Sequence, residues 1–245
     1  EYLHTIHHEV LVTPYDMLHA IPEVVRQIET YDTTTVRAST PMYLLSKYIS
    51  EKTDIKVILS GEGSDELSGS YRYFQNAPSS TELYEETLRL TDHLQFFDVL
   101  RCDKSTAAHG LEIRVPFLDN DFMNYYLHIN PQFKFYAMFG CEKYLLRNAF
   151  KGMLPDVVLW RKKEAFRDGV STTERSWFQI IQDHVKTIFI PEKQYEINPP
   201  MLKETLWYRS IFDDAYPNRE TLLPYYWLPK WCGNITDPSA RILTI

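Results

Sequence analysis

The fold is decided by a short apolar run that passes directly into a polar glycine loop, KVILSGEGSDEL at residues 56–67. The apolar part shows no polar–apolar alternation, which is typical of a strand buried on both faces of a parallel sheet. The two glycines of the loop let its backbone approach a ligand closely and offer N–H groups to an anion. Ligands bind beyond the carboxyl ends of the strands in such sheets, so this loop is the first candidate site.

The residues before this strand predict one more strand and two helices. Residues 8–12, HEVLV, predict a short strand. Thr13, Pro14 and Asp16 predict a helix start, because a capping hydroxyl, a proline at the first helical position and an acid at the third favour one. A second helix is expected from about Thr40 to Glu51. Its inward-facing residues are expected to be Met42, Leu45, Tyr48 and Ile49.

The residues after the loop predict mostly helices. One long helix is expected over residues 83–100, then a helix end at Gly110 and an extended link over residues 115–118. We expect one domain over residues 1–245, with an α/β portion at residues 1–75 and a mostly helical portion at residues 76–245. Further helices are expected near residues 119–129, 142–151, 174–189, 203–216 and 221–228.

Composition and charge argue against several classes of protein. The formal net charge of -7 argues against a general nucleic-acid binder, which needs a basic face. No apolar run approaches the roughly 20 residues needed to cross a bilayer. The chain opens at Glu1 without a basic-then-apolar leader, and a fragment or excised domain is the simplest interpretation. Cys102, Cys141 and Cys232 support neither a zinc site nor a disulfide framework, and favour the cytoplasm.

The acids of the loop point to a cation beside a phosphate. Glu62 and Asp65 would repel phosphate unless a cation intervened, so the pattern favours Mg²⁺ with a nucleotide or pyrophosphate. The loop is not a Walker A motif, because no Gly-Lys-Ser/Thr follows it. An acidic, glycine-rich surface turn stays open as the alternative.

Four blocks, in order along the chain, resemble the asparagine synthetase family. They are ETYDTTTVRAS at residues 29–39, SGEGSDEL at residues 60–67, AAHGLEIRVPFLD at residues 107–119 and WRKKEAFRDG at residues 160–169. The tail at residues 234–241 is similar to the eukaryotic type. The resemblance implies an α/β fold with a truncated doubly wound parallel sheet, of the adenine nucleotide alpha hydrolase (HUP-like) kind, followed by a mainly helical C-terminal part.

The resemblance also implies a reaction and roles for single residues. In that family ATP, with Mg²⁺, activates aspartate as β-aspartyl-AMP, and ammonia derived from glutamine attacks this intermediate to give asparagine. Ser60 and Gly61 match the ATP-contacting pair, and Glu62 matches the glutamate that forms and uses the intermediate. Asp65 matches an acid that holds Mg²⁺, and Lys163 matches a lysine that stabilises charge on the phosphates.

Further positions match the family's substrate-binding residues. Thr34 and Arg37 would bind aspartate or a phosphate oxygen, and Gly63 and Ser64 belong to the same signature loop. Arg37 has an ordinary interhelical salt bridge as its alternative. For Lys163 the alternative is a solvated face, because it closes a run of three basic residues.

Other conspicuous residues are expected to be structural. Arg114 and Asp119 are expected to form an internal ion pair. His4, His7 and His8 lack an acid partner at metal spacing, so a metal site is not expected there. The aromatic cluster over residues 225–231 is expected to be core or interface.

The sequence also departs from the family pattern. The family's Ser-Gly-Gly-x-Asp-Ser loop and its amidotransferase domain are absent before Glu1, so this chain alone is expected to be inactive and to bind ATP weakly. Arg167 replaces a usual serine, and LSGSY at residues 67–71 replaces the LFGGY of bacterial members. Two other functions stay open: a non-catalytic homologue that acts as a binding or homodimer partner, and an ATP-dependent amide-forming enzyme of β-lactam synthetase type.

Overall fold

The computed structural model describes residues 2–163, 166, 170, 175–191, 193–239 and 243. Two strands, β1 (Val57–Leu59) and β2 (Glu112–Arg114), pair in parallel. The α-helices are α1 (Pro14–Ile28), α2 (Thr33–Lys52), α3 (Ser64–Ser68), α4 (Ser80–Asp92), α5 (Asp98–Ala107), α6 (Asn120–His128), α7 (Tyr136–Phe139), α8 (Tyr144–Ala149), α9 (Asp156–Leu159), α11 (Trp177–Thr187) and α12 (Lys203–Ala215). The 3-10 helices are η1 (Arg72–Asn76), η2 (Leu94–Phe96), η3 (Pro116–Leu118), η4 (Pro131–Lys134) and η5 (Glu220–Leu222).

Helix α1 begins where the sequence predicts. The hydroxyl of Thr13 accepts a hydrogen bond from the backbone N–H of Asp16, and the Asp16 carboxylate accepts one from the backbone N–H of Thr13. This reciprocal capping satisfies two N–H groups that the first turn leaves without partners. The helix then buries the apolar face that its spacing predicts, at Met17, Ile21, Val24, Val25 and Ile28.

Helix α2 begins seven residues earlier than predicted. Asp32 caps it by accepting hydrogen bonds from the backbone N–H and the hydroxyl of Thr35, both at 2.8 Å. Thr33, Thr34 and Thr35 therefore form the first turn of the helix. The expected inward position of Leu45 is wrong, since this side chain is exposed.

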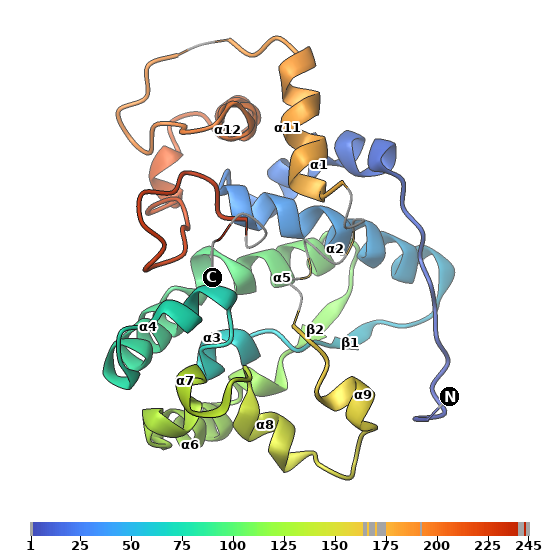
Figure 1. Cartoon of the computed structure of the whole chain (residues 1–245). Coiled ribbons are helices and arrows are strands. Elements are labelled where there is room, and N and C mark those ends of the chain that lie inside the picture. The colour runs from blue at the N-terminus through green and yellow to red at the C-terminus, as the bar shows by residue number, and fades with distance from the viewer. Residues whose placement is uncertain are drawn as a thin grey trace.

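The helices form layers around one hydrophobic core. Helix α2 packs against both α1 and α5, and α1 contacts α12, which in turn packs on α11 (Figure 1). The core lies among these layers and includes Ile21, Ile28, Trp177, Tyr208 and Phe212. Aromatic residues of the tail join it, with Trp227 buried and Tyr225, Tyr226 and Trp231 packed against it, which confirms the predicted core role of that cluster.

The sheet is smaller than the sequence predicts. Ile58 pairs with Ile113, and the backbone N–H of Ser60 extends the ladder to the carbonyl of Arg114 at 2.9 Å. The strand predicted at residues 8–12 is wrong, because that segment has no ladder partner among the described residues. Burial of β1 on both faces is also wrong, since Leu59 is 73% exposed. The structure therefore has an α/β character with a two-stranded parallel sheet.

The long helix predicted over residues 83–100 is broken. Phe97 adopts φ −133° and ψ −98°, which no helix allows, and η2 separates α4 from α5. Gly110, with φ +67°, closes the turn after α5. Residues 116–118 form η3 rather than an extended link. Helices α6, α8, α11 and α12 confirm four of the later predictions, whereas the helix predicted over residues 221–228 is replaced by the short η5.

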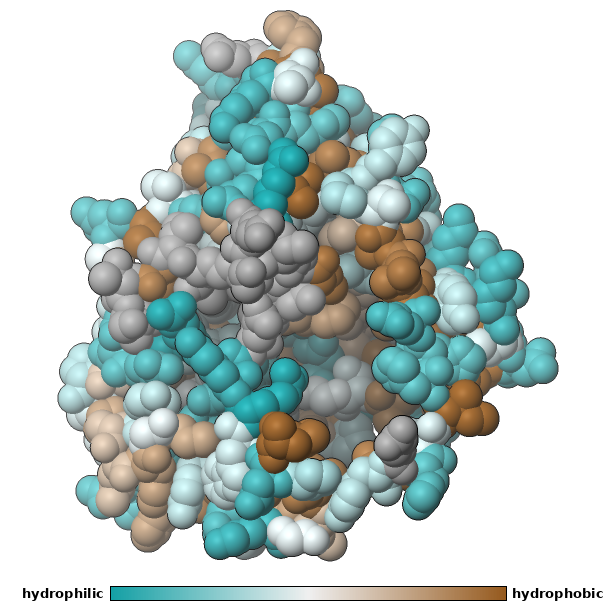
Figure 2. Space-filling model, turned by 45° about the vertical axis from the view of Figure 1, so that its right-hand side comes forward, coloured by the Kyte–Doolittle hydropathy of each residue, from teal (hydrophilic) through white to brown (hydrophobic). Residues whose placement is uncertain are grey.

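Hydrophobic side chains do not gather in one large patch on the face of the molecule drawn in Figure 2. On the side drawn in Figure 2, hydrophilic and hydrophobic residues lie in small interleaved patches. Among the described helices, none has the length and apolar character that crossing a membrane requires.

Candidate functional site

The candidate site is a cavity beyond the carboxyl end of β1. Its volume is about 370 Å³, which lies in the range of about 300 to 1,000 Å³ typical of small-molecule sites. The apolar wall comes from α2, with Met42, Leu45 and Ile49. The polar wall comes from the glycine loop, the start of α5 and Lys163. It contains Ser60, Gly61, Glu62, Asp65, Tyr71, Asp98, Arg101 and Lys163.

The two glycines of the loop serve different purposes. Gly61 lines the cavity, and a Cβ atom there would meet no described atom within 4 Å. Its backbone is therefore open to a ligand. Gly63 has φ +84° and caps α3, and a Cβ atom at this position would lie 2.2 Å from Cδ2 of Leu118. Gly63 thus permits the turn that carries the chain from β1 into α3.

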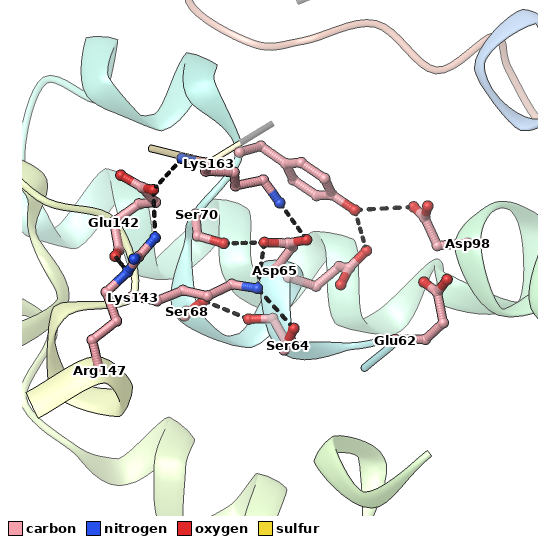
Figure 3. Close-up of polar contacts among 12 residues, drawn as sticks. Glu62, Ser64, Asp65, Ser68, Ser70, Asp98, Glu142, Lys143, Arg147 and Lys163 are labelled. Carbon is pink, nitrogen blue, oxygen red and sulfur yellow. Dashed lines mark hydrogen bonds and ion pairs between the residues drawn. The ribbon is translucent and has the colours of Figure 1, made fainter. Parts of the chain in front are cut away.

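Asp65 is held between two lysines. Nζ of Lys163 lies 2.5 Å from Oδ2 of Asp65, and Nζ of Lys143 lies 2.8 Å from Oδ1 (Figure 3). The hydroxyl of Ser70 donates a hydrogen bond to the same carboxylate, and Lys143 also donates to the hydroxyl of Ser64 at 2.9 Å. Burial alone would raise the pKa of Asp65, but Lys163 and Lys143 hold that pKa far below its usual value. This carboxylate is therefore ionised at neutral pH.

Glu62 has a cationic partner of a different kind. Nη2 of Arg101 lies 2.9 Å from Oε2 of Glu62 and 2.8 Å from Oδ1 of Asp98, so one guanidinium joins the two carboxylates. Burial raises the pKa of Glu62 above its usual value. Arg101 opposes this shift, whereas Asp98 and Asp65 add to it. Glu62 is thus poised to take up a proton more readily than an exposed glutamate, as a general base must.

A second buried carboxyl lies beneath the loop. Glu66 is buried, and the hydroxyl of Tyr71 donates a hydrogen bond to it. Burial raises the pKa of Glu66 well above its usual value, and Asp98 and Asp65 raise it further. The ring of Tyr71 also lies 5.3 Å from Nζ of Lys163. The ring of Tyr71 therefore supports the lysine, and its hydroxyl partly opposes the rise in the pKa of Glu66 by donating to the carboxylate.

Thr34 and Arg37 lie apart from this group. Both are buried in the first turns of α2, and neither belongs to the described lining of the cavity. Arg37 pairs with Glu204 of α12 at 2.5 Å and with Asp237 of the tail at 2.8 Å. All of its guanidinium nitrogens are occupied, so the structure favours the salt-bridge alternative over substrate binding. The Thr34 hydroxyl has no hydrogen-bond partner among the described residues.

Arg114 and Asp119 do not pair with each other, so that prediction is wrong. Nε of Arg114 pairs with Glu112 at 2.8 Å, and both side chains are exposed. Asp119 instead caps α6 by accepting hydrogen bonds from the backbone N–H groups of Asp121 and Phe122. The N–H groups at the start of α6 thus take up the carboxylate that sequence proximity assigns to Arg114.

Parts of the predicted site lie outside the described residues. Arg167 is one of them, together with most of the block that follows Lys163 and the end of the tail block from residue 240. Of the basic run at residues 161–163, only Lys163 lines the cavity, whereas Arg161 and Lys162 are exposed.

Sequence reasoning missed several residues of the site. Asp98 and Arg101 stand three apart on one helix and so share a face, a spacing that could have identified them. Lys143 gives no such signal, because it reaches Asp65 from a loop before α8. Its role depends on tertiary contacts that the local pattern does not contain.

The described residues do not form a metal centre of their own. No group of three or more His, Cys, Asp or Glu among them is arranged to hold a metal ion. Oδ1 of Asp65 pairs with Lys143 and Oδ2 pairs with Lys163, so a cation bound there would share the carboxylate with two ammonium groups. Repulsion from these ammonium groups disfavours Mg²⁺ at Asp65 unless phosphate oxygens bind with it.

Comparison with known proteins decides the family. A family model described as Asparagine synthase matches residues 1–96 and 78–235. This chain belongs to the asparagine synthase family. It is 51% identical over 245 residues to "Asparagine synthetase [glutamine-hydrolyzing]" of Gallus gallus, which covers 97% of the chain and 43% of that relative. The protein of the same name from Homo sapiens is 48% identical over 246 residues, covering 97% of the chain and 44% of the relative.

A viral relative shows similar identity and coverage. "Probable asparagine synthetase [glutamine-hydrolyzing]" of Acanthamoeba polyphaga mimivirus is 47% identical over 244 residues, which is 98% of the chain and 44% of that protein. The chain thus spans less than half the length of the curated relatives it matches. The similarity covers nearly the whole chain, whereas each relative also contains a long region that this chain does not match.

Proposed function

We propose that this chain forms the aspartate-activating part of an asparagine synthase. The complete reaction joins aspartate and ammonia with the use of ATP, through a β-aspartyl-AMP intermediate. The observation that carries the proposal is the grouping of Ser60, Gly61, Glu62, Asp65 and Lys163 around one cavity at the end of β1. These are the residues of the family's signature positions, and they come from two distant blocks of the sequence.

The charges of the site suit acyl adenylation. The ammonium groups of Lys163 and Lys143 would stabilise the negative charge that grows on the phosphates as pyrophosphate leaves. Glu62, with a raised pKa, would accept a proton from the attacking ammonia in the second step. The exposed backbone of Gly61 allows the nucleotide to approach the strand end closely.

Magnesium belongs to the same proposal, with a condition. Mg²⁺ is usually bound through one or two carboxylates plus substrate phosphates. Since Asp65 is already paired with two lysines, we expect the ion to bind here only together with phosphate oxygens. No step of the reaction is assigned to it.

The remaining parts of the proposal concern the whole protein. The 73% exposure of Leu59 supports a larger doubly wound sheet in the complete protein, in which a helix would cover this face of β1. The names of the relatives support glutamine as the ammonia source. We expect this chain alone to bind MgATP weakly. A cytoplasmic location, supported by three free cysteines, and a homodimer stay predictions.

The test is aspartate-dependent exchange of labelled pyrophosphate into ATP, measured with the complete gene product. This exchange reports adenylate formation alone and needs no ammonia. We expect exchange with aspartate, loss of it in Glu62→Ala, and retention in Glu51→Ala, whose side chain is exposed at the end of α2. Absence of aspartate-dependent exchange in the unchanged protein would contradict the proposal and favour a non-catalytic binding role. Unchanged exchange in Glu62→Ala would remove the role given to Glu62.

A further inference from the structure

Lys163 lies in a segment without regular secondary structure. After α9 ends at Leu159, residues 161–163 form neither helix nor strand. Within the part of the chain that the structure describes, residues 162–163 make no backbone–backbone hydrogen bond. The described contacts of Lys163 are made with side chains: Glu142 accepts its backbone N–H, and its ammonium group meets Asp65 at 2.5 Å.

Arg147 of α8 spans this segment. Its Nη1 donates hydrogen bonds to the carbonyl oxygens of Leu159 and, at 3.0 Å, of Arg161. Its Nε donates to the carbonyl oxygen of Glu142 at 2.9 Å, and its Nη2 donates to Oε1 of Glu142 at 2.7 Å. All three guanidinium nitrogens are in use. A planar group with fixed donors can hold several acceptors at once, which a lysine cannot do.

Glu142 connects this arginine to Lys163 itself. Oε1 of Glu142 accepts a hydrogen bond from the backbone N–H of Lys163 at 3.0 Å, in addition to the bond from Arg147 (Figure 3). The next residue, Lys143, has φ +57°, a left-handed conformation uncommon for lysine, and its ammonium group reaches Asp65. Residues 142–143 thus set the positions of both lysines that pair with Asp65.

We propose that Glu142 and Arg147 are positioning residues that clamp the main chain of residues 159–163 and so place the ammonium group of Lys163 in the cavity. Neither residue belongs to the described lining of the cavity, so they act through Lys163. Both side chains are mostly buried, at 17% and 13% exposure, where charge-assisted hydrogen bonds are strong. The consequence for phosphate binding rests on the proposed function, whereas the clamp itself does not.

The experiment measures the reactivity of the Lys163 amine directly. The protein is acetylated briefly with N-acetoxysuccinimide at fixed pH, and mass spectrometry gives the labelling of Lys163 relative to the exposed Lys186. Freeing the segment should raise this ratio roughly fivefold in Arg147→Met and in Glu142→Ala, because local opening governs access to a paired amine. Arg26→Met, which removes an exposed arginine of α1, is the matched control and should leave the ratio unchanged.

A conservative variant separates positioning from general loss of structure. Glu142→Gln keeps an oxygen that can accept the N–H of Lys163 but loses the charge that pairs with Arg147. It should therefore raise the ratio less than Glu142→Ala does. An unchanged ratio in folded Arg147→Met and Glu142→Ala overturns the proposal. If those two variants fail to melt cooperatively, an unchanged ratio in Glu142→Gln overturns it instead.

Inorganic pyrophosphate distinguishes this inference from the proposed function. In the complete gene product with magnesium present, pyrophosphate should protect Lys163 from acetylation in the unchanged protein and protect it less in Arg147→Met. Lys163 could become more reactive in the variants while pyrophosphate gives the unchanged protein no protection. That result would support the clamp and contradict the proposed phosphate site. Protection of equal extent in the unchanged protein and in Arg147→Met would overturn the clamp and leave the phosphate site standing.

Discussion

The ammonium group of Lys163 lies 2.5 Å from the carboxylate of Asp65. The sequence predicts ligands of opposite charge for these two residues: a cation for Asp65 and a phosphate for Lys163. In this structure each serves as the partner of the other, and Lys143 completes the set at 2.8 Å. The charges of the site are thus balanced internally. A ligand must exchange these ion pairs for its own, so phosphate and cation should bind together.

Magnesium alone should bind weakly to this protein. Because Asp65 already has two cationic partners, calorimetric titration with MgCl₂ should give a dissociation constant above about 1 mM, since Mg²⁺ relies on substrate phosphates to complete its ligands. Adding inorganic pyrophosphate should tighten the binding of magnesium. Asp65→Asn should abolish that gain. Tight binding of magnesium without pyrophosphate would show that the lysines do not compete for Asp65.

Gly63 and Gly61 should respond differently to the same substitution. Gly63→Ala places a Cβ atom 2.2 Å from Cδ2 of Leu118 at a residue with φ +84°. We expect it to lower the free energy of unfolding in urea by about 3 kcal/mol, from left-handed strain and overpacking together. Gly61→Ala meets no described atom within 4 Å and is the control. It should change stability by less than about 0.5 kcal/mol.

A stability loss of similar size in both alanine variants would mean that the whole loop, rather than the turn at Gly63, is sensitive to substitution.

The two variants should also differ in ligand binding. Gly61→Ala should weaken pyrophosphate or nucleotide binding in a folded protein, because it adds a methyl group where the backbone faces the cavity.

Local sequence patterns predict where a helix begins more reliably than they predict which side chains are buried. Thr13 and Asp16 specify the start of α1 because capping depends on residues three apart. The start of α2 was missed because threonines at residues 33–35 look unfavourable for a helix until Asp32 is seen to cap them. The prediction that β1 is buried on both faces is wrong because an apolar strand indicates that its faces need covering, but not that this chain supplies the covering elements.

The same contrast holds for the site. The glycine loop and Lys163 could be found from the sequence, because a family signature carries them. Arg37 lies in an equally specific block, yet its guanidinium is used by Glu204 and Asp237. These partners lie more than 160 positions away along the chain, and no local pattern links them to α2. Lys143 and Arg147 were missed for the same reason.

Arg101 should control the proton affinity of Glu62. Burial raises the pKa of Glu62 and Arg101 opposes that shift, so Arg101→Met should raise this pKa further. If Glu62 acts as a base, the acid limb of the pH profile for asparagine formation should move to higher pH. The exposed Arg114→Met is the matched control and should leave the profile in place. An unshifted acid limb in a folded Arg101→Met protein would indicate that another group sets that limb.

The Arg37–Asp237 pair should make stability depend on pH in the acid range. Burial alone would raise the pKa of Asp237, but hydrogen bonds and the charge of Arg37 hold it below its usual value. A carboxylate with a lowered folded pKa contributes stability above its unfolded pKa of about 4, and this contribution is lost as the pH falls below that value. Asp237→Asn should therefore lower the free energy of unfolding by about 2 kcal/mol at neutral pH. Urea unfolding should show the difference from the unchanged protein shrinking below about pH 4, and a constant difference there would mean that Asp237 contributes by packing rather than by charge.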